Sequence, residues 1–223
     1  MKIVYLILSL SIVFFSGCTT LTIDEHRANE QQIKINKDES VVVLGRRHSS
    51  EYETEPKLIE CVGNVLSRGS DGLNVVPEDE FLDAMYPWFE PRTAPLKVKD
   101  LSRFLDDSAI EEVMKRLNVT YIIWIDGKTE VTDSSGSIGC TISVGAAGCF
   151  GFGTWDKESD YEAIVWDYRN RRREGQLSAD ASGTSYVPAV VIPIPIIAQV
   201  RKSACNGMGE QLKGFFAAQD STP

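Results

Sequence analysis

The sequence is poor in histidine and contains none of the common catalytic motifs. Its only two histidines, His26 and His48, do not stand near a cysteine pair with zinc-like spacing. No Gly-x-Ser-x-Gly, P-loop or His-Glu-x-x-His motif occurs, and the glycine-rich residues 145–153 lack the Lys-Ser/Thr of a phosphate loop. We therefore expect no bound metal, no cofactor and no enzymatic activity.

Positive charge is scarce as well. The chain has 23 Lys and Arg against 32 Asp and Glu, which gives a net charge of −9 at pH 7. The only dense basic run is Arg171, Arg172 and Arg173, whose place between two strand-like segments is typical of a solvated turn. The chain thus lacks the electrostatic footprint of a nucleic-acid-binding protein, and we expect no nucleic-acid partner.

The apolar run at residues 4–15 is short for a helix that spans a membrane, which needs roughly 20 residues. It follows Lys2 and precedes Ser16, Gly17 and Cys18. A positive charge, about a dozen apolar residues and then small residues are typical of a secretory signal. The ending Phe-Ser-Gly-Cys resembles the bacterial lipobox. This resemblance implies that residues 1–17 are removed and that Cys18 becomes the first residue and carries the lipid.

The resemblance also implies a location. Bacterial lipoproteins without Asp directly after the cysteine usually go to the outer membrane, and here Thr19 and Thr20 follow Cys18. We therefore expect a lipid anchor in the outer membrane with the protein facing the periplasm. Two or more acyl chains hold a protein stably, whereas a single chain anchors weakly. Because the removed segment contains Lys2 and no acidic residue, the mature chain has a net charge of −10.

Composition divides the chain into four parts. Residues 1–17 are the predicted signal, and residues 18–39 are polar without a sustained period, which predicts a flexible, lipid-anchored tether. Residues 40–217 carry the strand and helix patterns of a folded domain. Residues 218–223 are expected to form a disordered tail.

Four cysteines remain in the mature chain, and an even number in an exported protein suggests disulfides. Four cysteines allow three connectivities. Cys140 and Cys149 bracket a short loop that closes easily, so we expect them to pair. Cys61 and Cys205 would then form the second bridge and bring the first and last helices together.

Apolar periodicity predicts the elements of the folded domain. Residues 119–125 form an almost continuous β-branched run, which favours a central strand covered on both faces. Ser108 and Glu111 match a capping box at the start of a helix. A Gly- and Ser-rich excursion is expected over residues 128–160. The other expected elements are strands at residues 41–44, 74–76, 161–168 and 175–184, and helices at residues 56–68, 78–89 and 200–215.

This order predicts an α/β fold, with a single mixed sheet of about five strands, helices packed on its faces and a disulfide-stapled Gly-rich excursion. It resembles the periplasmic α/β domain shared by the N-terminal part of the Tol translocation protein, the curli secretion lipoprotein and the lipoprotein activators of penicillin-binding proteins. The resemblance is carried by the opening strand at residues 41–45, by LNVTYIIWIDG at residues 117–127 and by AIVWDYRNRRREG at residues 163–175.

These features favour a non-catalytic outer-membrane lipoprotein that binds a protein partner in envelope assembly or maintenance. A second hypothesis is an oligomeric secretion-channel component like the curli lipoprotein, although the alternating limb around Ile142 is shorter than the ~9–11 residues of a membrane-crossing strand. A third is an envelope hydrolase, for which Asp126 at the end of the central strand is the candidate residue.

The most apolar part of the mature chain is VPAVVIPIPIIAQV, residues 187–200. Its three prolines exclude a helix and a place in a central strand, so it must run extended at an edge or in a loop. We expect most of it to be core beneath the last helix, with exposure confined to residues 193–195. The alternative is an exposed partner-binding patch, whose candidates are Ile192, Pro193, Ile194, Pro195 and Ile196.

Overall fold

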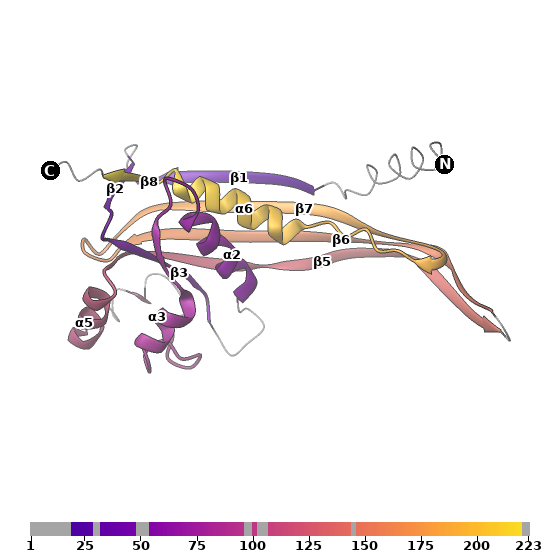
Figure 1. Ribbon diagram of the computed structural model, residues 1–223, viewed down its shortest axis with the longest axis horizontal. Helices are drawn as coiled ribbons and strands as arrows, with labels where there is room; N and C mark the ends of the chain where they lie inside the picture. Colours follow the sequence, from indigo (N-terminus) through magenta and orange to yellow (C-terminus); the bar gives the residue numbers. More distant parts are fainter. Residues whose placement is uncertain are drawn as a thin grey trace, which may run out of the picture. The chain divides into compact units, whose positions relative to one another are not determined.

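The structure is a computed structural model that describes residues 19–28, 32–47, 54–95, 100–101, 107–143 and 146–219. The predicted signal at residues 1–17 and the predicted lipid site Cys18 lie outside these residues. The described elements, in chain order (Figure 1), are β1 (Thr19–Arg27), β2 (Ile33–Asn36), β3 (Ser40–Gly45), α2 (Pro56–Ser67), β4 (Asn74–Val76), α3 (Glu78–Ala84), α5 (Ser108–Arg116), β5 (Val119–Ser143), β6 (Ala146–Asp167), β7 (Arg172–Pro193), α6 (Val200–Lys213) and β8 (Phe216–Gln219).

The strands form a mixed six-stranded sheet in the order β1-β7-β6-β5-β3-β4, with a small parallel pair formed by β2 and β8. Strand β3 pairs in parallel with both β4 and β5. Neighbours β5 and β6 run antiparallel, since Tyr168 contacts Thr120 while Ser159 contacts Thr129. The predicted α/β class, with one mixed sheet and helices, is therefore confirmed, and the sheet has six strands because β1 joins it.

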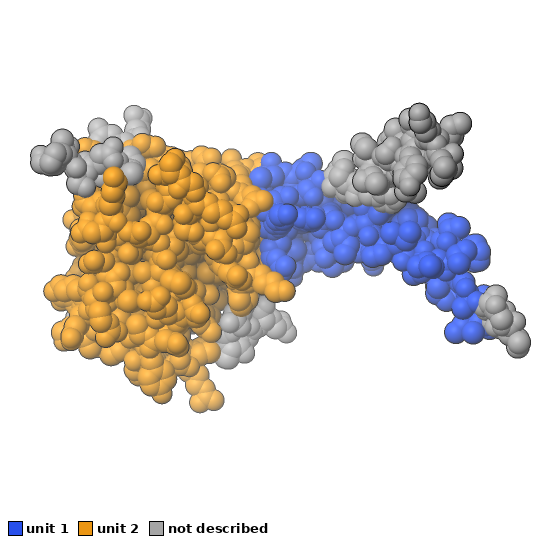
Figure 2. All heavy atoms as spheres, viewed as in Figure 1, with its two compact units in different colours: residues 1–21, 129–159, 181–203 blue, residues 22–128, 160–180, 204–223 orange. Residues whose placement is uncertain are grey.

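The chain divides into two compact units (Figure 2). Unit 1 comprises residues 1–21, 129–159 and 181–203, and unit 2 comprises residues 22–128, 160–180 and 204–223. Unit 2 contains α2, α3 and α5 and the parallel strands. Unit 1 contains the later part of β5, the earlier part of β6, the end of β7 and the residues that follow it.

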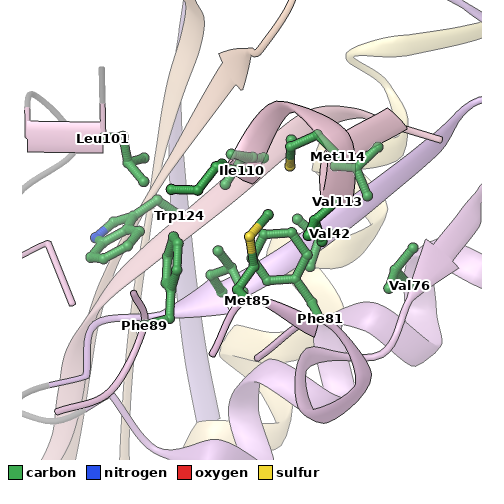
Figure 3. Packing of buried hydrophobic residues seen from close by; sticks show 13 residues of the cluster. Val42, Val76, Phe81, Met85, Phe89, Leu101, Ile110, Val113, Met114 and Trp124 are labelled. Carbon is green, nitrogen blue, oxygen red and sulfur yellow. The ribbon is translucent and has the colours of Figure 1, made fainter. Parts of the chain in front are cut away.

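The core of unit 2 forms where α3 and α5 cover one face of the sheet (Figure 3). Successive strand residues point to opposite faces, so Val42 and Ile122 lie under these helices while Val41 and Ile123 face the other way. All four side chains are buried, which confirms that this part of β5 is covered on both faces. The cluster under α3 and α5 includes Leu44, Phe81, Met85, Ile110, Met114 and Trp124.

Local signals predicted several elements well. Helix α2 ends one residue before the predicted end, and β4 covers the predicted residues. The cap of α5 differs, because Asp107 and not Ser108 is its N-cap, and the Asp107 carboxylate accepts a hydrogen bond from Ala109 N at 2.9 Å. Both residue types cap helices, and the aspartate simply stands one residue earlier.

The expected flexible tether over residues 18–39 is corrected by the structure. Residues 19–27 form β1, which joins the sheet beside β7, and residues 33–36 form β2. In β1 every second side chain from Ile23 to Arg27 is half-buried, so a period of two is present but is carried mostly by polar residues. At the other end, β8 extends to Gln219, so the expected tail begins within a strand, and residues 220–223 lie outside the described part.

The Gly-rich excursion expected at residues 128–160 is present with its Cys140–Cys149 bridge, and it is built of strands. Strands β5 and β6 continue through it and reach 25 and 22 residues, far longer than the limbs expected from the sequence. Glycine is needed within this ladder. Gly136 and Gly151 have positive φ, and a Cβ on either would collide with the carbonyl oxygen of Phe152 or Ser137 on the facing strand. Glycines that suggested a loop therefore allow two strands to approach closely.

Candidate functional site

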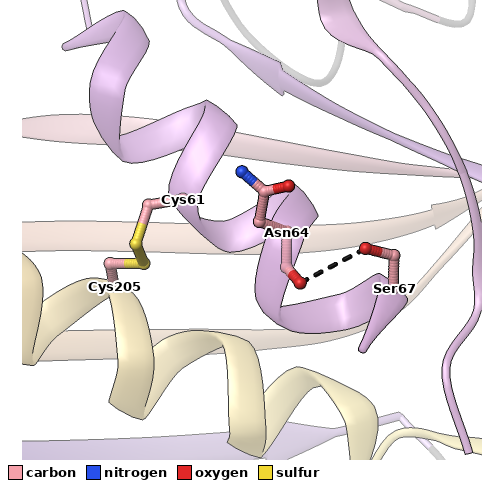
Figure 4. The surroundings of a disulfide bond; sticks show 4 residues. All are labelled: Cys61, Asn64, Ser67 and Cys205. Carbon is pink, nitrogen blue, oxygen red and sulfur yellow. Dashed lines mark hydrogen bonds between the residues drawn. A yellow bond between two sulfur atoms is a disulfide. The ribbon is translucent and has the colours of Figure 1, made fainter. Parts of the chain in front are cut away.

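The structure contains both predicted disulfides. Cys61 of α2 is bonded to Cys205 of α6, which holds these two helices side by side (Figure 4). Cys140 of β5 is bonded to Cys149 of β6 in unit 1. Cys205 of the first bridge is buried, whereas Cys140 of the second bridge is exposed.

The first described residues adjoin the predicted lipid site. Thr19 directly follows Cys18 and begins β1. The hydroxyls of Thr20 and Ser182 share a hydrogen bond at 2.7 Å, and Ala28 N donates to Glu174 O, so β1 runs antiparallel to β7. The described part of the sheet therefore begins at the residue that follows Cys18 in the sequence.

Most of residues 187–200 is exposed, so the expectation that they are core is wrong. Val190 is 74% exposed, Ile192 68% and Ile194 54%, while Ile196 is half-buried. The partner-binding candidates Ile192, Pro193, Ile194 and Pro195 all lie at the surface. Only three residues of the run are buried: Ala189, Ala198 and Val200.

A signal for this exposure was present in the sequence. Residues 181–200 contain no charged side chain, and neither do residues 134–155. Both stretches lie in unit 1. Hydrophobicity alone suggested a core, but most of residues 187–200 lie at the surface.

Unit 2 has a groove of about 600 Å³ along α2. It extends from the first turn of the helix to Ser67 and continues past β4 to the start of α3. In Figure 4 the Ser67 hydroxyl, at the end of α2, donates to Asn64 O. The groove is lined by Val43, Pro56, Lys57, Ile59, Glu60, Gly63, Asn64, Ser67, Val75, Val76, Pro77, Glu78 and Asp79. Sequence reasoning did not find this groove, because it depends on the spacing between α2 and β4.

A polar cluster lies where β5 and β7 begin and β6 ends. Burial raises the pKa of Tyr121 to about 12, and the charges of Asp167, Glu39 and Glu174 add to this rise. Each of these buried carboxylates has a partner. Arg169 bonds Glu39, Arg172 Nε lies 2.6 Å from Glu174 Oε1, and Asn170 donates from N and Nδ2 to Asp167 at 2.9 and 2.7 Å. The cluster fixes the β6–β7 turn, where the arginine run was expected.

Asp126, the catalytic candidate of the hydrolase hypothesis, interacts with Arg46 and Gly127 at the end of the parallel part of β5. Its Oδ1 lies 3.0 Å from Arg46 Nε and accepts a hydrogen bond from Gly127 N at 2.8 Å. Within the described residues, no group of three or more His, Cys, Asp or Glu side chains is arranged to hold a metal ion. In the same part of the chain, no helix combines the length and apolar composition required to cross a membrane.

No family model matches the chain, and no curated protein matches it. Solved structures do show a likeness. A PelC dodecamer from Paraburkholderia phytofirmans aligns with a TM-score of 0.40 and 13% identity over 90% of this chain and 100% of that one. A point variant of the same dodecamer aligns with a TM-score of 0.39 and 12% identity, over 88% and 98% of the two chains. At these TM-scores the likeness carries no inference about assembly or role.

Proposed function

We propose that the protein is a non-catalytic lipoprotein of the outer membrane that binds a protein partner in envelope assembly or maintenance. The lipid is attached at Cys18, and the folded chain faces the periplasm. In this proposal the partner contributes an extended segment, which lies in the groove along α2 in unit 2.

The position of β4 carries the proposal. This strand ends the sheet order and pairs with β3, and no other described strand pairs with it. Its free edge offers backbone N–H and C=O groups to an added strand, which is a recurring mode of peptide recognition. The groove beside it provides the space for such a strand.

The dimensions of the groove fit a short peptide. Helix α2 has 12 residues and is therefore about 18 Å long, at 1.5 Å per residue. An extended peptide of about five residues covers the same length. The exposed Pro56 and the half-buried Val75 offer apolar contacts, while Lys57 and Glu60 are exposed beside them with opposite charges. Pockets for alternate side chains beside a backbone edge give such sites their specificity.

A photo-crosslinking residue at Asn64, which is exposed in the groove, tests this proposal in cells. We expect it to capture a defined protein, whereas the same residue at the exposed Lys115 of α5 should not. Gly63→Leu should fill the groove and abolish capture. A Cβ at Gly63 would lie 3.5 Å from Val75 Cγ1, so the first added carbon fits without strain. Equal capture from Asn64 and Lys115, or capture that persists in Gly63→Leu, would contradict the proposal.

A second candidate is an oligomeric secretion component. It is favoured by the lengths of β5 and β6, because residues 130–142 of β5 are exposed and the paired residues of β3 extend only to its Ile125. A free strand edge of this length is a template for pairing with another copy. The molar mass of the detergent-extracted protein, measured by light scattering, tests it. A single-chain mass would exclude this candidate and leave the groove proposal untouched.

A further inference from the structure

Unit 1 contains two stretches without charge in a chain that is otherwise 25% charged. Residues 134–155 and 181–200 carry no Asp, Glu, Lys or Arg. At the average composition, each stretch would hold about five charged side chains. A soluble surface strand normally alternates apolar and charged or polar residues, which keeps its outer face in water. In these two stretches the polar side chains are those of Ser, Thr and Gln199, and no charged side chain is present.

The same two stretches hold most of the exposed apolar surface of the described chain. Thirteen large apolar side chains are exposed, and only Leu21, Tyr86 and Val131 lie elsewhere. Soluble monomers seldom expose such concentrated apolar surface without a use for it. The other ten are Ile138, Ile142, Phe150, Phe152, Tyr186, Val190, Val191, Ile192, Ile194 and Ile197.

Residues 190–197, which include the end of β7 and are here named the aliphatic loop, contain four successive residues without an unbonded backbone N–H. Pro193 and Pro195 have no N–H group. Ile194 N donates to Pro188 O at 3.1 Å, and Ile196 N donates to Tyr186 O at 2.7 Å. From residue 193 to residue 196, each backbone N–H is therefore either absent or bonded within the protein. In hydrocarbon an unbonded N–H costs several kcal/mol, so the absence of unbonded N–H groups from residue 193 to residue 196 suits a lipid environment.

The residues around the loop suit the border between lipid and water. Arg201 and Lys202 follow it within a few residues, and both are exposed. Phe152 and Tyr186 stand near it as a ring pair, with centroids 6.1 Å apart. Basic residues attract anionic headgroups, and aromatic residues collect at the membrane interface.

The proposed lipid site places this surface close to a membrane, a step that rests on the proposed function. Thr20 lies beside Ser182, so Cys18 is two residues from a described contact. Val190 is eight residues further along β7, which corresponds to about 26 Å at 3.3 Å per residue. A lipid on Cys18 would hold unit 1 at the bilayer surface, so that the aliphatic loop could reach the bilayer.

We infer that the aliphatic loop is a second membrane contact, whose Val and Ile side chains are buried among the acyl chains of the bilayer. Its composition favours lipid over protein. Protein interfaces are centred on Tyr, Trp and Arg anchors, whereas this loop consists only of Val, Ile and Pro. A bilayer interior favours exposed apolar side chains and disfavours unbonded N–H groups, and residues 193–196 meet both conditions.

Vesicle flotation of the Cys18→Ser protein tests the inference, because this variant has no lipid of its own. Vesicles of phosphatidylethanolamine and phosphatidylglycerol should carry the protein with them. Ile194→Ser should weaken the partition about tenfold, since burial of an isoleucine is worth at least one such factor. Val131→Ser, which changes a 57% exposed side chain outside both uncharged stretches, should not weaken it.

A second readout measures depth directly. In Ile194→Trp, brominated acyl chains should quench the added fluorescence, while in Val131→Trp they should not. Failure of the Cys18→Ser protein to bind vesicles, or equal results for the two positions, would overturn the inference. So would an Ile194→Ser variant that keeps its vesicle binding but loses a protein crosslink in cells, which would assign the loop to a protein partner. The assay contains no anchor and does not involve the groove, so its outcome is separate from that of the proposed function.

Discussion

Gly209 of α6 lies against Val65 of α2 so closely that a Cβ on Gly209 would stand 2.6 Å from Val65 Cγ1. The two helices meet here one turn from the Cys61–Cys205 bridge. Glycine in a helix interior is normally unfavourable, so its place here is explained by the close approach of the helices.

Two helical glycines should therefore respond to alanine in opposite ways. Gly209→Ala should lower the free energy of unfolding by about 1–3 kcal/mol, because the added methyl overpacks the contact with Val65. Gly63→Ala should raise it by up to about 1 kcal/mol, because the new Cβ meets only Val75 Cγ1, at 3.5 Å. Urea unfolding of both variants measures the two signs. A stabilising Gly209→Ala would show that α2 and α6 do not approach in this way.

The two disulfides should differ in their effect on stability. On the chain-entropy relation, the bridge between Cys61 and Cys205, with a sequence separation of 144, is worth about 5 kcal/mol. The Cys140–Cys149 bridge, with a separation of 9, is worth about 3 kcal/mol. Replacement of each pair by alanines, followed by denaturant unfolding, compares them. If removal of the Cys140–Cys149 bridge lowered the free energy of unfolding more than removal of the Cys61–Cys205 bridge, the proposed role of the longer bridge in holding α2 against α6 would be contradicted.

Asp180 makes stability depend on pH. Partial burial, the nearby charges of Asp160 and Asp24 and a hydrogen bond with Asp160 raise its pKa above the ordinary 3.8. The folded chain thus holds this proton to a higher pH than the unfolded chain, so the group favours folding below pH 3.8 and loses this contribution as pH rises through the folded-state pKa.

Asp180→Asn should accordingly raise the melting temperature at pH 7, and the gain should disappear below pH 3.8. Asp133→Asn, which changes an exposed carboxylate on a different strand, β5, serves as the control. Melting curves across this pH range give the comparison. A gain that stays constant down to low pH would argue against carboxylate repulsion as its cause.

Two neighbouring residues at the start of α5, Asp107 and Ser108, should differ in their contribution to stability. Asp107→Ala should cost about 1 kcal/mol of stability, because Ala109 N loses its hydrogen-bond acceptor. Ser108→Ala should cost much less, since Ser108 is the first helical residue. Thermal unfolding of the two variants measures the difference, and the reverse order would restore the capping box expected from the sequence.

Local patterns predicted the elements whose signals are local. The stripe of Leu58, Val62 and Val65 predicted α2, and the β-branched run after Val119 predicted the buried start of β5. Strand β1 was missed because its half-buried face includes Glu25 and Arg27; the Glu25 carboxylate accepts hydrogen bonds from Arg27 and from Gln211. Neither residue type indicates a strand by itself.

Burial could not be predicted where it depends on distant parts of the chain. Residues 187–200 have the composition of a core, and their exposure follows only from how much structure is available to cover them. The groove beside β4 likewise depends on the distance between two elements, and no pattern in either element records that distance. The lack of charge in residues 134–155 was visible in the sequence, but glycine in the same residues favoured a loop.

The central claim is that the chain carries a covalent lipid at Cys18. Mass spectrometry of the N-terminal peptide, from protein purified out of its membrane, tests this claim most directly. We expect a peptide that begins at Cys18 and carries acyl chains, and we expect Cys18→Ser to release the protein from the membrane fraction or leave it held only by the aliphatic loop. A peptide that retains residues 1–17, or one that begins at an unmodified Cys18, would contradict the proposed anchor.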